Sequence, residues 1–107
     1  MLEIKKAAAL ANLNAGVLTK RKAAVISQAA DYLLQNSAER RELTRIDGLA
    51  GGAGTSFNMN INEALSYILS VKFKTRLSYL DDINKSQSTN DVFPTAVKMA
   101  ALRLLKI

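Results

Sequence analysis

Apolar residues recur at helical spacing in two long segments of this 107-residue chain. In residues 20–35 one side of a helical wheel collects the apolar residues Ala23, Ile26, Ala29, Ala30, Leu33 and Leu34. In residues 57–72 the same spacing aligns Ile61, Ala64, Leu65 and Ile68. This period is typical of amphipathic helices that bury one side against the rest of a protein. The sequence therefore predicts two packed helices as the centre of the fold.

Two further helices are predicted at the ends of the chain. Residues 3–14 read as a helix that Gly16 ends, and Thr19 is a good N-cap for the helix that follows. The last helix starts between Ser88 and Pro94, because proline is tolerated in a first helical turn, and continues to the end of the chain.

The remaining segments are predicted to be loops. Residues 38–48 are charged, residues 45–54 could form a short hairpin, and residues 73–85 are loop with at most one helical turn. The predicted fold class is therefore mostly α, with four main helices and at most that short hairpin.

The last predicted helix is apolar on more than one side. Its main apolar stripe, expected to face the protein, is Phe93, Val97, Ala100, Leu104 and Ile107. Met99 and Leu102 fall on the side that we expect to face solvent. Helices of this kind are normally buried within a larger assembly. We therefore expect the chain to be part of a longer protein.

The amino-acid composition excludes several kinds of catalytic and binding site. The chain has no Cys and no His, which excludes disulfides, thiolate chemistry and a Ser-His-Asp triad, and removes the commonest transition-metal ligand. No apolar run approaches the roughly 20 residues of a membrane helix. We expect one small domain in a reducing, cytoplasmic compartment.

The formal net charge of +6 suggests an anionic partner. However, the basic residues are scattered along the chain, Lys5 and Lys6 among them, and few aromatic residues accompany them. A nucleic-acid-binding module is therefore the weaker interpretation.

The stretch GGAGTSFNMN, residues 51–60, crowds small polar groups behind three glycines. A glycine-rich turn that enters a helix can bind an anion through free N–H groups and the helix dipole. Thr55, Ser56, Asn58 and Asn60 are more polar groups than a loop needs, and we expect that a core cannot hide them. The alternative is a flexible turn followed by an ordinary N-cap.

A second polar stretch, NKSQSTND, covers residues 84–91. Ser88 and Asp91 imitate a capping box, which accounts for those two residues but leaves Asn84, Gln87 and Asn90 unexplained. Brought together, the two stretches would make a pocket of hydroxyl and amide donors suited to carboxylates. The residues alone predict an anion site without identifying its ligand.

The two stretches, extended to GGAGTSFNMNINEA and NKSQSTNDVFPTA, resemble two of the three signature regions of the aspartase/fumarase superfamily. The preceding KKAAALANLNAGVLTKRKAAVISQAADYLL resembles the helical stretch before the first signature. Gly-Ala-Gly-Thr at 52–55 and Ser-Thr-Asn-Asp at 88–91 are similar to the aspartate ammonia-lyase branch, and class II fumarases are the alternative.

The resemblance implies a substrate and roles for four residues. The substrate would be a four-carbon dicarboxylate, aspartate or fumarate, with no metal or cofactor required. Thr55, Ser88 and Thr89 would hold the carboxylate that becomes a dianion, and Asn90 would hold the group at C2. Two departures from the family pattern are Phe57, where a small polar residue is common, and Ser-Tyr-Leu-Asp at 78–81, where many fumarases have a secondary anion-binding segment.

The third signature of the family, which carries the catalytic Ser and a carboxylate-binding Lys and Asn, does not occur in these 107 residues. The resemblance therefore implies that residues 1–107 are a partial N-terminal domain, without the central helical bundle and C-terminal domain. It also implies a homotetrameric parent enzyme, no catalytic residue within this chain, and no activity of the chain alone.

Overall fold

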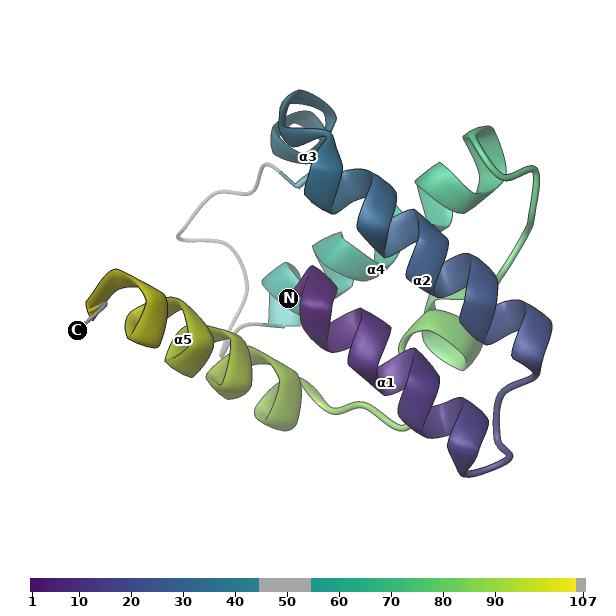
Figure 1. Ribbon diagram of the computed structural model, residues 1–107, viewed down its shortest axis with the longest axis horizontal. Helices are drawn as coiled ribbons and strands as arrows, with labels where there is room; N and C mark the ends of the chain where they lie inside the picture. The colour runs from purple at the N-terminus through teal and green to yellow at the C-terminus, as the bar shows by residue number, and fades with distance from the viewer. Residues whose placement is uncertain (45–54, 106–107) are drawn as a thin grey trace.

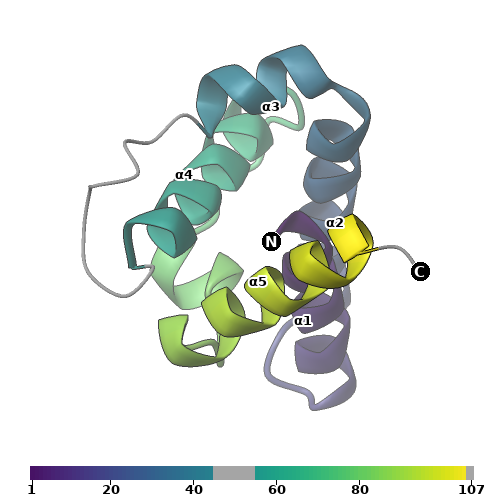
Figure 2. The same cartoon turned by 90° about the vertical axis from the view of Figure 1, so that its left-hand side faces the viewer.

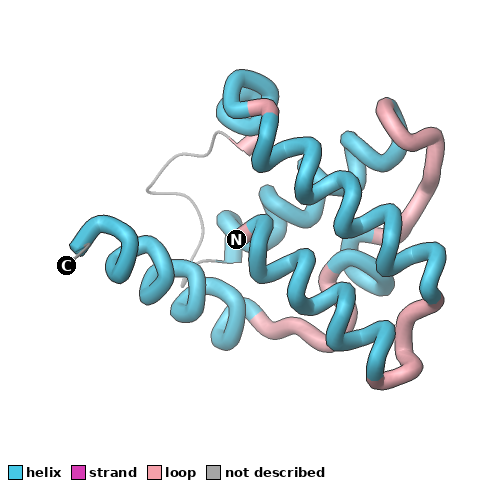
Figure 3. Tube along the Cα trace, in the orientation of Figure 1, coloured by secondary structure: helices cyan, strands magenta, loops and turns pink. Residues whose placement is uncertain are grey.

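The computed structural model describes residues 1–44 and 55–105, with Thr55, Tyr79, Leu80, Thr89 and Asn90 described by their backbone. Across these ranges every regular element is a helix and no strand occurs, as Figure 3 shows. The α-helices are α1 (Leu2–Asn14), α2 (Lys20–Gln35), α3 (Ser37–Leu43), α4 (Thr55–Val71) and α5 (Thr89–Leu105), and a π-helix, η1 (Tyr79–Ile83), lies between the last two. The mostly α prediction is confirmed, and the hairpin expected at 45–54 lies outside the described residues.

Helices α1 and α2 lie side by side and antiparallel, with α4 behind them (Figure 1). The short turn between α1 and α2 follows from local sequence. Gly16 adopts a φ of +78°, a backbone conformation that glycine takes without steric cost. Thr19 Oγ1 accepts a hydrogen bond from the Lys22 N–H at 3.2 Å, which confirms the predicted N-cap.

The apolar core lies between α1, α2 and α4. The stripe predicted on residues 20–35 is buried, with Leu34 at its edge, and the stripe on α4 is buried except for the half-buried Ile61. Ile26, Leu33, Leu65 and Ile68 are at most 1% exposed. The two predicted amphipathic helices are therefore the centre of the fold.

Helix α3 was not predicted. It is a seven-residue helix without a buried residue, so it carries no apolar stripe. It is joined to the end of α2 by the Arg40 guanidinium, which donates to the carbonyls of Leu33 and Leu34 at 3.1 and 2.8 Å. These bonds satisfy carbonyls at the end of α2 that have no partner within the helix.

Helix α5 packs by a side that shares Phe93 with the predicted stripe but differs from it further along the helix, and Ile107 of that stripe lies outside the described residues. Val92 is buried and Ala96 and Met99 are half-buried, whereas Val97 and Leu104 of the predicted stripe are 50% and 88% exposed. Because apolar residues occur on both sides of this helix, the sequence pattern does not fix its rotation. Side-chain contacts fix it instead, with Phe93 against Phe57 at one end and Arg103 against Glu3 at the other.

Figure 2 shows α5 from the direction in which it lies in front of the other helices. Its outer side exposes Leu102 and Leu105 as well, at 71% and 65%. None of the described helices combines the length and the apolar character needed to cross a membrane.

Candidate functional site

The four predicted substrate-binding residues all lie where a helix begins. Thr55 is the first residue of α4, and Thr89 and Asn90 are the first two residues of α5. Ser88 precedes α5 and is exposed, and its carbonyl accepts hydrogen bonds from the N–H groups of Asp91 and Val92 at 3.0 and 2.9 Å. N–H groups at the beginning of a helix favour anions, so both places suit a carboxylate.

The structure brings the flanks of these two helix beginnings together. The rings of Phe57 and Phe93 stack with their centroids 5.6 Å apart and their planes at 26°. Asn58 Nδ2 donates to Asn84 Oδ1 at 3.2 Å. Residues two and three positions after Thr55 are therefore in contact with residues on both sides of Ser88. Phe57, a departure from the family pattern, provides one of these contacts.

A lysine joins the same two segments from α1. Lys5 Nζ donates to Asn58 Oδ1 at 2.7 Å, to Asn84 Oδ1 at 3.0 Å and to Gln87 Oε1 at 2.8 Å. Asn62 Nδ2 also donates to Asn84 Oδ1, at 3.1 Å. We call Lys5, Asn58, Asn62, Asn84 and Gln87 the amide cluster.

The amide cluster corrects one expectation from the sequence. Polar groups after Gly54 were expected to be too many for a core to hide, but Asn58 is 1% exposed and Asn62 is fully buried. They are tolerated because the cluster supplies most of their hydrogen bonds internally. Among the buried side-chain nitrogen and oxygen atoms in the described part of the chain, only Asn62 Oδ1 has no hydrogen-bond partner. Asn58 therefore lies inside the protein rather than in a ligand pocket.

Lys5 was counted among scattered basic residues, yet its side chain is fully buried. Burial lowers the pKa of its ammonium from 10.5 to about 8, because a charge loses the solvation of water. The sequence held one signal for this role, namely the amides in 84–91 that helix capping leaves unexplained. Asn84 and Gln87 accept hydrogen bonds from this buried ammonium.

Two more contacts attach the segment before α5 to the first helices. Asn12 Nδ2 donates to the Lys85 carbonyl at 2.8 Å. Lys22 Nζ forms an ion pair with Asp82 Oδ1 at 2.8 Å. Asp82 is therefore a structural carboxylate, and Asp81 beside it is exposed. The turn that leads to Ser88 is held from α1 and α2 together.

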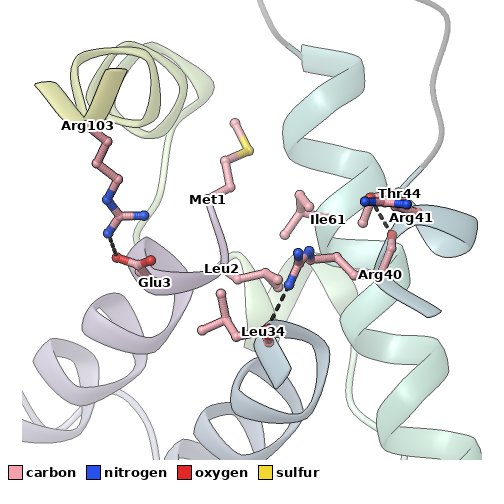
Figure 4. Close-up of a pocket in the computed structure, with 9 residues that line it drawn as sticks. All are labelled: Met1, Leu2, Glu3, Leu34, Arg40, Arg41, Thr44, Ile61 and Arg103. Carbon is pink, nitrogen blue, oxygen red and sulfur yellow. Dashed lines mark hydrogen bonds and ion pairs between the residues drawn. The ribbon is translucent and has the colours of Figure 1, made fainter. Parts of the chain in front are cut away.

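Figure 4 shows a different feature, a pocket of about 280 Å³ with three arginines among its lining residues. Two of these guanidiniums already have partners, since Arg40 donates to carbonyls of α2 and Arg103 pairs with Glu3. Ser88, the one predicted residue whose side chain the structure describes, is not among its lining residues.

In the described ranges, 1–44 and 55–105, no group of three or more Asp or Glu side chains is close enough to hold a metal ion. The prediction that metal plays no part stays a prediction, because it concerns the reaction and not these residues alone.

Comparison with known proteins agrees with these observations. A family model described as "Lyase" matches residues 1–107. Aspartate ammonia-lyase from Bacillus subtilis (strain 168) is 40% identical over 96% of this chain and 22% of its own length. Fumarate hydratase class II from Staphylococcus aureus (strain MSSA476) is 41% identical over 92% of this chain and 22% of its own length. Aspartate ammonia-lyase from Helicobacter pylori (strain J99 / ATCC 700824) is 39% identical over 92% of this chain. No solved structure gives a significant match.

A helical protein with polar helix beginnings placed side by side is thus matched along its whole length by a lyase model. The chain belongs to this lyase family, the aspartase/fumarase superfamily. It spans about 22% of the length of the curated relatives that it matches.

Proposed function

We propose that these residues supply part of the dicarboxylate-binding wall of an aspartate ammonia-lyase-like enzyme, which converts L-aspartate to fumarate and ammonia. The observation that carries the proposal is the contact between the two helix beginnings. Phe57 stacks on Phe93 and Asn58 bonds to Asn84, so Thr55 and Ser88 belong to neighbouring segments. Relatives named aspartate ammonia-lyase support the choice of substrate.

The proposed chemistry needs hydrogen-bond donors at one carboxylate of the substrate. Removal of a proton next to that carboxylate places a second negative charge on it, and fixed donors lower the energy of that dianion. Thr55, Ser88 and Thr89 are proposed to donate to it, and Asn90 to hold the amino group at C2. The N–H groups at the beginnings of α4 and α5 would add to this stabilisation, because the positive end of a helix dipole favours an anion.

The proposal assigns the rest of the reaction to residues outside this sequence. The 107 residues contain no His, and Asp82, near the second polar stretch, is paired with Lys22. Residues 1–107 are accordingly proposed to be part of an N-terminal domain of a cytoplasmic homotetramer, and to be inactive alone. A single wall of donors that is open to water has most of its electrostatic effect screened.

Fumarate hydratase is the second candidate, since relatives with that name match at similar identity. It would use the same wall, with water in place of ammonia at C2. The two functions are separated by which of two substrates, aspartate or malate, is converted to fumarate.

The test uses the complete protein that contains these residues and follows fumarate absorbance with aspartate and with malate. Thr55→Val and Ser88→Ala are each expected to lower kcat by roughly 10²-fold or more, as expected for the loss of one oxyanion donor. Thr95→Val is a matched control, because the exposed Thr95 hydroxyl bonds to a carbonyl within α5. The 107-residue chain alone is expected to show no turnover. Full activity of both variants, with the fold intact, would reduce the two segments to helix caps.

A further inference from the structure

The Lys5 ammonium lies where three separate parts of the chain meet. It projects from α1 and bonds to one amide of α4 and to two amides of the turn before α5. Asn58 is 53 residues away in sequence, and Gln87 is 82 residues away. One side-chain atom therefore connects both polar segments to the first helix.

This arrangement is expensive in free energy. A buried charge loses its hydration, and a carboxylate partner would normally compensate for much of that loss. The three acceptors of Lys5 are neutral amide oxygens, and the cause that lowers its pKa is burial. An apolar residue at this position would avoid the desolvation cost. The lysine thus needs an explanation beyond stability.

The geometry of the two polar segments provides such an explanation. Asn58 lies one helical turn after Thr55, so both residues are on the same side of α4. Gln87 immediately precedes Ser88, and its Nε2 group donates to the carbonyls of Ile83 and Lys85, which fixes the turn. An ammonium has three N–H donors, and Lys5 uses each on a different acceptor. The spacing of the two helix beginnings is thereby set by one group.

We propose that Lys5 is a positioning residue, which holds the beginnings of α4 and α5 at the separation that a dicarboxylate site requires. The inference rests on the proposed function for its catalytic consequence, whereas the connection between the segments rests on geometry alone. Lys5 does not touch the substrate. It acts through Asn58 on one side of the site and through Asn84 and Gln87 on the other.

The test compares Lys5→Met with wild type in the complete protein. Methionine has a similar length and flexibility but donates no hydrogen bond. Lys6→Met is the matched control, because Lys6 is the next residue of α1 and pairs with Asp31 away from the cluster, at 2.8 Å. If Lys5→Met does not fold, Gln87→Met removes one acceptor at a half-buried position outside the apolar core.

Two measurements decide the question. Hydrogen exchange of the amides in 84–91 should become about tenfold faster or more in Lys5→Met and should stay near the wild-type rate in Lys6→Met. In the activity assay kcat should fall about 10²-fold with a smaller change in KM, because misplaced donors lose transition-state contacts first. Lys5→Arg should recover part of kcat, since it retains the charge but its planar group does not reproduce three bonds from one atom.

Exchange in 84–91 that changes no more in Lys5→Met than in Lys6→Met would overturn the inference. Faster exchange with an unchanged kcat would reduce Lys5 to a structural residue, and would overturn it too. If the wild-type protein converts neither aspartate nor malate, the proposed function fails on its own and the catalytic consequence with it. The exchange experiment still decides whether Lys5 connects the segments.

Discussion

The protein has two buried regions of opposite character. Between α1, α2 and α4 the interior is apolar, with Ile26, Leu65 and Ile68 at most 1% exposed. Beside α4 lies the amide cluster, a cation and four amides, in which Lys5, Asn58 and Asn62 are at most 1% exposed and Asn84 and Gln87 are half-buried. The first region is stabilised by removing apolar surface from water. In the second, the hydrogen bonds only offset the free energy that its polar groups lose when they leave water. We infer that the first region holds the helices together and the second fixes where two of them begin.

The largest expected effect tests the apolar side of this comparison. Leu65→Ala should lower the free energy of unfolding by about 2–5 kcal/mol, because it removes buried methyl groups and leaves a cavity. Leu10→Ala, at a site 57% exposed, should change it by less than about 0.5 kcal/mol. Urea denaturation of the complete protein measures both. A similar loss in both variants would mean that burial in this structure does not describe the core.

The next prediction concerns the pH dependence of the amide cluster. The pKa of the Lys5 ammonium is about 8 in the folded protein and 10.5 when the chain is unfolded. Between these values the unfolded chain binds the proton and the folded protein does not, so the contribution of Lys5 to stability rises with pH. Below pH 8 both states are protonated, and the contribution is constant.

This prediction is measured as the difference in unfolding free energy between wild type and Lys5→Met. The difference should shift in favour of wild type between pH 8 and 10, with a slope of up to about 1.4 kcal/mol per pH unit. All other ionisable groups are the same in the two proteins, so their effects cancel in the difference. A flat difference over this range would show that the ammonium is hydrated and that the cluster is not a dry interior.

The two regions also differ in how far the sequence predicts them. The stripe on α2 was predicted residue by residue, because helical periodicity records which side is buried. Helix α3 was missed because SAERREL has no apolar side, and its position depends on bonds from Arg40 to α2. The side by which α5 packs was wrong because this helix is apolar on both sides, and Phe93 and Arg103 decide its rotation.

For the candidate site, the sequence located the polar segments but not what joins them. The surplus amides at 84–91 predicted a purpose beyond capping, and the expected purpose was a ligand. In the structure Asn84 and Gln87 instead accept hydrogen bonds from Lys5, which lies in α1, 79 and 82 residues away in sequence. Periodicity does not encode a contact between a single lysine and distant amides. The roles of Thr55, Ser88, Thr89 and Asn90 in binding stay predictions.

The smallest expected effect lies at the edge between the two regions, where η1 is attached to α2. Burial raises the pKa of the Asp82 carboxyl, but hydrogen bonds from Lys22 Nζ and the Ser78 N–H outweigh it, and the pKa lies below its ordinary value of 3.8. A carboxyl with a lowered pKa stabilises the folded state above its unfolded pKa, and this contribution is lost as the pH falls through the folded pKa. Asp82→Asn should therefore cost up to about 1 kcal/mol at pH 7, and progressively less as the pH falls below 3.8.

The matched comparison is Asp31→Asn, which removes a second ion pair with the same 2.8 Å separation. The Asp31 side chain is 45% exposed and that of Asp82 is 15% exposed, so water screens the Lys6–Asp31 pair more strongly. Asp31→Asn should cost less than Asp82→Asn at pH 7, by urea denaturation in parallel. Equal costs would mean that bond length rather than burial sets the strength of these contacts. The lower exposure of the Lys22–Asp82 pair would then not make it stronger than the Lys6–Asp31 pair.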